Sequence, residues 1–214
     1  MIKNIVFDLG GVIIPLNRVA CIRAFDDLLG YREFGKVLSN YRHLGFFDNF
    51  ETGSINSKQF RSIIRLNVSP IKEGRTKLFS DKDIDYCLNC YLCEIPQDKI
   101  DALLFFKYDY KLYLLSNTNP IGMTKSKQLF KDKGYKMEEI FEELFLSYKM
   151  KLAKPSEEIF NKMSKKAGIV PEETLFIDDS PANIQTASNL GYHTILFDPK
   201  ADLYDTIHKF FERK

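Results

Sequence analysis

Short runs of apolar residues recur along the chain and are separated by longer amphipathic stretches. The runs are nearly continuous rather than alternating, which is typical of strands buried on both faces of a parallel sheet. They lie at Ile5–Phe7, Leu112–Leu115, Leu144–Leu146, Leu175–Ile177 and Thr194–Phe197. Helical patterns separate the last four runs and follow the fifth, at Pro120–Lys133, Pro155–Ala167, Pro181–Leu190 and after Ala201. This alternation predicts an α/β protein with a doubly wound parallel sheet.

The segment over residues 16–95 breaks this rhythm. Its pattern is mostly helical, as in Arg18–Leu29 and Ser57–Leu66, and no run within it indicates a buried strand. Because the segment falls between the first two predicted strands, we expect a core formed by residues 1–15 and 96–214 with an inserted α-helical cap. The cap would lie at the carboxyl edge of the sheet, where ligands bind in open α/β folds.

Composition and charge narrow the class of protein. The 214 residues are 44% hydrophobic and 28% charged, with a formal net charge of +2 and no sustained basic stripe, which argues against nucleic-acid binding. No stretch approaches the roughly 20 apolar residues needed to span a bilayer, and Asp8 interrupts the N-terminal apolar run, so we expect neither a membrane span nor export. Four cysteines do not make a disulfide scaffold in a chain of this length, which favours a cytoplasmic location.

Polar residues follow the predicted strands. Asp8 ends the first strand, and the two glycines that follow it closely would let the backbone approach a ligand. Ser116 and Asn117 end the second strand and precede a helix, where a hydroxyl and free N–H groups can hold an anion. Taken alone, each motif is also consistent with an ordinary turn or helix cap.

A lysine and an acidic pair complete the set. Lys154 precedes a long helix and offers a compact positive charge suited to a phosphate oxygen. Asp178 and Asp179 follow a buried strand, and an oxygen-preferring cation such as Mg²⁺ would relieve the repulsion between them. Alone, the lysine would be a solvated surface residue and the pair a capping turn. Together with Asp8 and Ser116, they form a set suited to phosphoryl transfer.

The order of these motifs resembles the haloacid dehalogenase superfamily, in the subgroup with a helical cap after the first motif. Asp8, Ser116, Lys154 and the pair Asp178–Asp179 correspond to its four motifs, and the resemblance covers essentially the whole chain. The runs LLSNTN and LAKPSEEIF are similar to small bacterial sugar-phosphate phosphatases, including those that act on α-D-glucose 1-phosphate. The resemblance implies a Rossmann-like core and a Mg²⁺-dependent phosphatase of a small phosphorylated metabolite.

The resemblance also implies which residues perform the chemistry. Asp8 would attack phosphorus and form an aspartyl-phosphate. The second Asp8 oxygen, the Gly10 carbonyl and Asp179 would ligate Mg²⁺, with Asp178 binding directly or through water. Each of these four residues offers an oxygen atom at or just after the end of a predicted strand.

Three further residues would handle the phosphoryl group. The resemblance implies that Ser116 and the Asn117 amide hold this group while Lys154 neutralises the charge that it shares with Asp8. Because two anions must meet in such a reaction, positioning and charge neutralisation would supply most of the catalysis.

Gly10 departs from the pattern of most phosphatases in the superfamily. They carry a second Asp at this position, which protonates the leaving group and later activates water. Losing a positioned acid or base forfeits a factor of roughly 10² to 10⁴ unless another group replaces it. His43, Asp48 and Glu51 lie in a predicted cap loop and are candidates, although charged loop residues are usually just solvated.

Other functions remain open from the sequence. A haloacid dehalogenase, in which Asp8 attacks carbon, does not need the metal, so the acidic pair favours phosphorus over carbon. A phosphonate hydrolase would need a cap lysine that forms a Schiff base, for which Lys36 and Lys58 are candidates. Gly10 also allows a catalytically silent protein that binds a phosphate ligand or a protein partner, because fold alone does not prove activity.

Cys87, Cys90 and Cys93 form a C-x₂-C-x₂-C triplet. Iron–sulfur sites use this spacing but need a fourth ligand, and position 97 is Gln rather than Cys. On a helix the three thiols would drift along one face, and free Cys is commonly buried as a small hydrophobe. We therefore expect the triplet to pack the cap rather than to bind metal.

Overall fold

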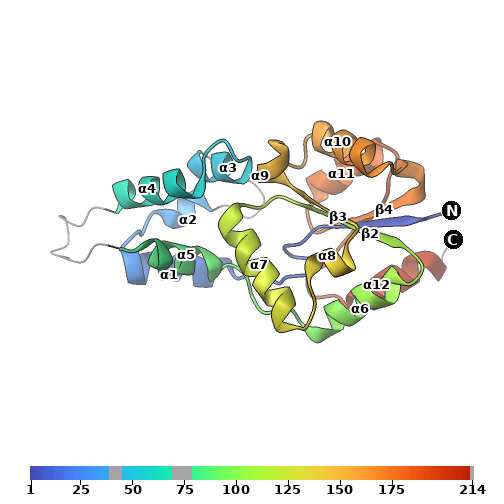
Figure 1. Ribbon diagram of the computed structural model, residues 1–214, viewed down its shortest axis with the longest axis horizontal. Coiled ribbons are helices and arrows are strands. Elements are labelled where there is room, and N and C mark those ends of the chain that lie inside the picture. Colours follow the sequence, from blue (N-terminus) through green and yellow to red (C-terminus); the bar gives the residue numbers. More distant parts are fainter. Residues whose placement is uncertain (39–44, 69–78, 213–214) are drawn as a thin grey trace.

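The computed structural model describes residues 1–38, 45–68 and 79–212. Five strands form one parallel sheet in the order β3-β2-β1-β4-β5, so the first strand of the chain lies at its centre (Figure 1). The strands are β1 (Asn4–Phe7), β2 (Lys111–Ser116), β3 (Glu143–Leu146), β4 (Thr174–Asp178) and β5 (His193–Leu196). The predicted doubly wound α/β core is confirmed.

The register of the three central strands sets up the functional edge. Phe7, at the end of β1, lies opposite Leu114 of β2 and Ile177 of β4. Because the strands are parallel and nearly level, the residues that follow these positions emerge at the same carboxyl edge of the sheet.

Helices cover both faces of the sheet (Figure 1). Alternate residues of β1 face opposite sides, with Ile5 and Phe7 in one hydrophobic cluster and Val6 in another. The helices of the first cluster are α6 (Gln97–Lys107), α7 (Pro120–Asp132), α8 (Met137–Ile140) and α12 (Leu203–Glu212). Those of the second are α10 (Glu157–Ala167) and α11 (Pro181–Asn189). The short helix α9 (Ser147–Met150) follows β3, and the 3₁₀ turn η2 (Pro171–Glu173) precedes β4.

Between β1 and α6, the described residues form five helices, and we call them the inserted helices. They are α1 (Arg18–Leu29), α2 (Phe34–Val37), α3 (Phe46–Glu51), α4 (Ser57–Asn67) and α5 (Asp81–Asn89). Their buried side chains and Ile121 of α7 form an aromatic-rich cluster, in which the Phe50 and Phe60 rings stack with centroids 4.3 Å apart. In Figure 1 they form one end of an elongated molecule, away from both chain termini.

The two connections to the inserted helices run side by side. Leu16 and Leu92 form an antiparallel bridge, and the Cys93 N–H donates to the carbonyl of Pro15 at 2.9 Å. This short ribbon keeps the start and the end of the insertion together at the edge of the sheet.

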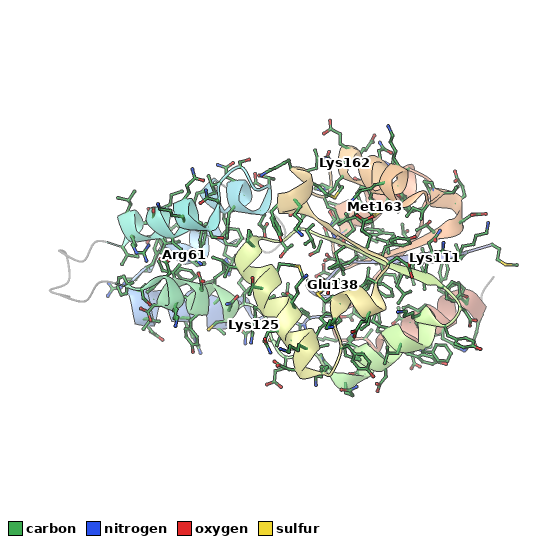
Figure 2. All side chains as sticks on the ribbon, viewed as in Figure 1. Arg61, Lys111, Lys125, Glu138, Lys162 and Met163 are labelled. Atoms are coloured by element: carbon green, nitrogen blue, oxygen red, sulfur yellow. The ribbon has the colours of Figure 1, made fainter. Side chains whose placement is uncertain are left out.

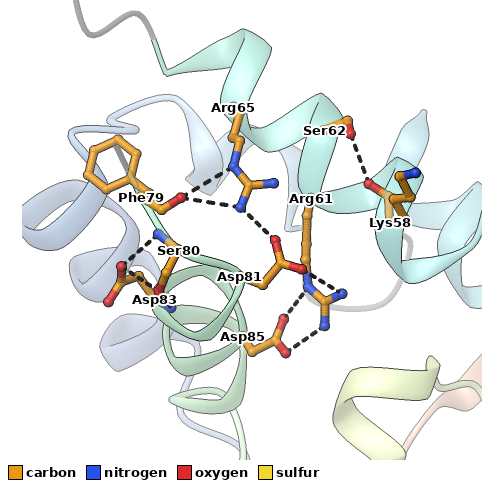
Figure 3. A network of polar contacts seen from close by, with 9 residues as sticks. All are labelled: Lys58, Arg61, Ser62, Arg65, Phe79, Ser80, Asp81, Asp83 and Asp85. Atoms are coloured by element: carbon orange, nitrogen blue, oxygen red, sulfur yellow. Dashed lines mark hydrogen bonds and ion pairs between the residues drawn. The ribbon is translucent and has the colours of Figure 1, made fainter. Parts of the chain in front are cut away.

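Ion pairs join α4 to α5 within the insertion (Figure 3). Arg61 donates to both carboxylate oxygens of Asp85, at 2.8 and 2.7 Å. Arg65 lies one helical turn further along, and it donates to Asp81 at 2.6 Å and to the carbonyl of Phe79. Arg61 also lies 3.4 Å from Asp81, so two guanidinium groups face two carboxylates. Figure 2 places Arg61 among the inserted helices and Lys111 of β2 at the far end of the molecule.

Two details differ from the sequence-based prediction. The edge strand β5 is not buried on both faces, and Leu196 is 54% exposed, because only β4 pairs with it and no strand covers its other side. The helix α10 begins at Glu157, because the Ser156 side chain accepts a hydrogen bond from Glu158 and caps it. In the described part of the chain, no helix has the length and apolar character needed to cross a membrane.

Candidate active site

Lys154 lies at the centre of the polar residues on the carboxyl edge. Its ammonium nitrogen is 2.8 Å from Asp8 Oδ1 and 2.6 Å from Asp178 Oδ2, and it donates to the carbonyl of Leu115 at 2.8 Å. The Lys154 side chain is only 1% exposed. Its burial opposes the charge, but Asp178 and Asp8 outweigh that effect and raise the pKa of Lys154. The lysine is therefore a buried cation shared by two carboxylates.

Asn117 holds the backbone of Lys154 in place. Its side-chain oxygen accepts from the Lys154 N–H at 2.9 Å, and its side-chain nitrogen donates to the Lys154 carbonyl, also at 2.9 Å. Sequence reasoning assigned the Asn117 amide to the phosphoryl group. Since the side chain is committed to Lys154, the backbone N–H is the part of Asn117 that could face an anion.

Asp178 is fully buried and saturated with donors. One oxygen accepts from the Ser180 N–H at 2.8 Å, and Asn183 donates to both oxygens at 2.9 and 3.0 Å. Sequence reasoning gave Asn183 no role, although its position in the first turn of α11, just after the acidic pair, could have indicated one. These bonds and the ion pair with Lys154 orient Asp178.

Three carboxylates cluster beside the Lys154 ammonium. Oxygen atoms of Asp8, Asp178 and Asp179 all lie within 4.8 Å of one another. Burial raises the pKa of Asp8 to about 7, against the lowering effect of Lys154 and with a further increase from Asp178. Burial, followed by the charge of Asp178, raises the pKa of Asp179 to about 6. Three acids facing one lysine leave negative charge that a divalent cation would neutralise.

Gly11 lets Asp179 enter this cluster. Its φ is +81°, and a Cβ atom at this position would overlap with the Asp179 carboxylate. The donor set is made of oxygen atoms alone, which fits a hard cation such as Mg²⁺ better than a metal that prefers nitrogen or sulfur. The residues present therefore suit the cation that the sequence led us to expect.

Ser116 lies beside the cluster at the end of β2 and is 2% exposed. Its hydroxyl is 3.4 Å from the carbonyl of Asn117, too long for a strong O–H···O bond. So weak a bond leaves the hydroxyl free to donate to an anion instead.

An apolar side chain borders the position where most relatives carry the second acid. A Cβ atom on Gly10 would lie 3.2 Å from a terminal methyl of Leu16, so this side chain borders the space that an aspartate would need. Asp48 is exposed on α3, whereas Glu51 ends that helix and its carbonyl accepts a hydrogen bond from the core. His43 lies outside the described residues.

Lys36 and Lys58, the candidates for a Schiff base, are both exposed. Lys36 forms an ion pair with Glu33, the residue that precedes its short helix. Neither lies in the kind of apolar pocket that commonly surrounds a Schiff-base lysine.

The cysteine triplet does not lie on one helical face. Cys87 is buried in α5, Cys90 caps the end of that helix, and Cys93 belongs to the connecting ribbon. Within the ranges that the structure describes, the acids at positions 8, 178 and 179 form the group of metal-ligating side chains that come close enough to hold an ion. Helix α5 ends too early for the predicted face, because the chain must return to the core.

The fold and this site define a haloacid dehalogenase-like hydrolase. The model of that family matches residues 2–191, and the chain belongs to it. Both the resemblance noted in the sequence and the expected enzyme class, a hydrolase, are thereby confirmed.

Relatives of similar length come from two bacteria. A D-ribitol-5-phosphate phosphatase of Bacteroides thetaiotaomicron is 33% identical over 94% of this chain and 95% of its own. A HAD family enzyme of the same organism, crystallised as an Asp-to-Ala mutant with magnesium and inorganic phosphate, has a TM-score of 0.89 and 38% identity over 97% and 99% of the two chains. A predicted HAD-like hydrolase of Porphyromonas gingivalis has a TM-score of 0.88 and 35% identity over the full length of both chains.

A dehalogenase also shares the fold. The L-2-haloacid dehalogenase of Xanthobacter autotrophicus has a TM-score of 0.57 and 18% identity, over 91% of this chain and 76% of its own. At this identity the likeness concerns the architecture of the chain and not its chemistry.

Proposed function

We propose that this protein is a Mg²⁺-dependent phosphatase of small phosphate monoesters, with Asp8 as the nucleophile. The observation that carries the proposal is the excess of three clustered carboxylates over one buried ammonium. A site built only to pair charges would balance them, whereas a site for a divalent cation needs unpaired acids.

Asp8 is positioned for attack at the end of the central strand. Lys154 holds one of its oxygens at 2.8 Å, which fixes the carboxylate and offsets the repulsion between two approaching anions. In the first step, an Asp8 oxygen forms a bond to phosphorus while the bond from phosphorus to the ester oxygen breaks. Water then cleaves the aspartyl-phosphate and regenerates Asp8. Ser116 and the Asn117 N–H would hold the phosphoryl oxygens throughout.

Asp8, Asp179 and the Gly10 carbonyl would hold Mg²⁺, with Asp178 contributing directly or through water. The cation, when bound, neutralises charge that develops on the phosphoryl oxygens. Asp178 already accepts bonds from Lys154, Ser180 and Asn183, so it also has a structural duty that Asp179 lacks. The crystals of the Bacteroides enzyme with magnesium and phosphate support this assignment.

A sugar or sugar-alcohol phosphate is the substrate class that we propose. The named relative acts on D-ribitol 5-phosphate, and the sequence runs LLSNTN and LAKPSEEIF point to sugar phosphates as well. Residues 16–95 would act as a cap over a core of residues 1–15 and 96–214 and select the alcohol. A cytoplasmic location agrees with four cysteines that are all free thiols.

Gly10 bears on which alcohol leaves most easily. With no acid at this position, rates should depend steeply on the acidity of the leaving group. An anomeric phosphate or an aryl phosphate should then react faster than glucose 6-phosphate. Gly10→Asp should flatten this dependence, provided that the Leu16 side chain moves aside by a few tenths of an ångström.

The decisive test is phosphate release from a panel of esters with and without Mg²⁺. The panel contains ribitol 5-phosphate, glucose 1-phosphate, glucose 6-phosphate and p-nitrophenyl phosphate, and 2-chloropropionate serves as the dehalogenase control. Metal-dependent phosphate release supports the proposal. Halide release without metal would favour the dehalogenase. Binding of phosphate without turnover of any ester would favour a silent member of the family.

A further inference from the structure

The turn that ends α3, residues 51–53, contacts the core at a place separate from the connecting ribbon. The Ser147 hydroxyl lies 2.6 Å from the carbonyl of Glu51, and the Lys151 ammonium donates to the carbonyl of Gly53. We call residues 51–53 the docking turn. Its partners belong to the segment that joins β3 to Lys154, next to the candidate active site.

Ser147 has two acceptors and one hydrogen. Its oxygen accepts from the Thr118 N–H at 2.9 Å, and it lies 3.0 Å from the carbonyl of Thr118 as well as 2.6 Å from that of Glu51. A hydroxyl donates one hydrogen at a time. Since Ser147 is fully buried, leaving that hydrogen without an acceptor would be costly. It can therefore bond to Glu51 when the turn is docked and to Thr118 when the turn departs.

Gly53 allows the backbone of the docking turn to touch the core. A Cβ atom at this position would overlap with the carbonyl oxygen of Tyr148 and lie 2.7 Å from the Lys151 nitrogen. Gly45 precedes the same helix with almost the same φ, +65° against +66°, yet a Cβ atom there would meet nothing within 4 Å. The close approach is thus particular to Gly53 and is not a general requirement of the ends of α3.

We propose that residues 51–53 are the docking point through which the inserted helices close on the active site, and that Ser147 is the positioning residue for this closure. Thr118 is two residues beyond Ser116 and adjacent to Asn117, so Ser147 links the docking turn to the backbone that would hold the phosphoryl group. Because the Ser147 hydroxyl can donate either to Glu51 or to Thr118, the turn can dock and depart without leaving this buried donor unpaired. This inference rests on the proposed function for its kinetic readout but not for its structural one.

The first test compares Gly53→Ala with Gly45→Ala. Both substitutions introduce a side chain at positive φ, but only the Gly53→Ala side chain would overlap with the core. We expect kcat/KM for the preferred sugar phosphate to fall at least roughly tenfold further in Gly53→Ala than in Gly45→Ala, because backbone must move to relieve the overlap. Equal losses in the two variants would overturn the docking role.

The second test compares Ser147→Ala with Ser126→Ala. Ser126 is equally buried, and its hydroxyl bonds to Gly122 within α7, away from the docking turn. Losing one hydrogen bond is worth roughly a 3- to 10-fold change, which we expect in KM for Ser147→Ala and not for Ser126→Ala. Ser147→Thr, which keeps the hydroxyl, should restore much of the loss. If Ser147→Ala fails to fold, the glycine pair still decides the question.

Hydrogen–deuterium exchange measures docking without any substrate. In Gly53→Ala, peptides that cover residues 147–153 should exchange faster than in wild type, whereas in Gly45→Ala they should not. Unchanged exchange at residues 147–153 in Gly53→Ala would overturn the inference whatever the activity. If the wild-type protein proves inactive toward every ester while exchange changes as expected, the proposed function fails and docking stands.

Discussion

The protein contains two clusters of ionised side chains that differ in balance. Among the inserted helices, Arg61 and Arg65 face Asp81 and Asp85, two cations against two anions, in a partly exposed network (Figure 3). At the edge of the sheet, the three acids at positions 8, 178 and 179 cluster beside the buried Lys154 ammonium, which pairs with the first two of them.

From this difference we expect one cluster to serve stability and the other to serve function. A balanced, bidentate network joins two helices and requires no further ion. An unbalanced buried cluster destabilises the metal-free fold, as the raised pKa values of Asp8 and Asp179 indicate. Such a cost is typical of a site prepared for a charged ligand. Substitutions in the buried cluster should therefore change activity, whereas those in the balanced network should change stability alone.

Asp8→Asn should have the largest effect on activity. An amide is a poor nucleophile toward phosphorus, so we expect turnover to fall by a factor of at least roughly 10³. The pKa of Asp8 is raised to about 7 in the folded protein, so its ionised form destabilises the metal-free fold at pH 8. The melting temperature of the metal-free variant should therefore rise. Residual activity of one tenth or more, measured by phosphate release, would contradict the covalent mechanism.

Lys154→Ala should remove both activity and stability. It leaves Asp8 and Asp178 buried without their shared counter-charge, at a cost of about 3–5 kcal/mol in the free energy of unfolding. Urea denaturation measures the loss. Mg²⁺ affinity should change little, because the lysine contacts Oδ1 of Asp8 and Oδ2 of Asp178 and leaves the second oxygen of each acid to the cation. A variant as stable as wild type would show that the two acids do not depend on this ammonium.

Asp179→Ala should act on the metal. Removing an oxygen donor should weaken Mg²⁺ binding by at least about 10- to 100-fold, the range found for groups that only support a ligand. Calorimetric titration of the purified variant tests this directly. Gly11→Ala, which would displace the same carboxylate, is expected to weaken binding as well. Wild-type affinity in Asp179→Ala would refute the proposed metal site.

The stabilisation by Mg²⁺ should grow with pH. The pKa values of Asp8 and Asp179, about 7 and about 6, lie above those of unfolded carboxyls. The metal-free fold should thus lose stability as pH rises toward 7, as the two acids give up their protons. Because Mg²⁺ binds the ionised acids, its effect on the melting temperature should be larger at pH 8 than at pH 5.5. A constant shift, followed by differential scanning fluorimetry, would contradict the raised pKa values.

Arg61→Ala should have the smallest effect, and it should lower stability while leaving activity nearly unchanged. It breaks the bidentate pair with Asp85. Because the Arg61 and Asp85 side chains are 19% and 27% exposed, the loss should cost about 1 kcal/mol in the free energy of unfolding. Activity at 25 °C should stay within about twofold of wild type, because this pair is remote from Lys154. The stability of Arg61→Lys, which cannot form the two parallel bonds, should lie between that of wild type and that of Arg61→Ala. A large loss of activity at full stability would erase the contrast between the clusters.

Much of the fold could be predicted because its signals are local. Apolar runs indicated all five strands, and the bounds predicted for α1 agree with the structure. β5 differed because its place at the edge of the sheet is a property of strand order, which no run of residues encodes. The cysteine triplet was assigned to one helix because the turn that ends α5 serves the return to the core rather than a local preference.

The sequence by itself determined the types of residue at the strand ends and their order, and these suffice to indicate the family. Only the tertiary structure decided how those residues divide the work. The Asn117 side chain bonds to the Lys154 backbone, and Asn183 donates to Asp178. The carbonyl of Glu51 meets the Ser147 hydroxyl, 96 positions away in the sequence. The physical reason is that a hydrogen bond or ion pair depends on distances of about 3 Å between side chains. Such distances arise only when distant segments pack together, whereas a motif records just the residues available to make them.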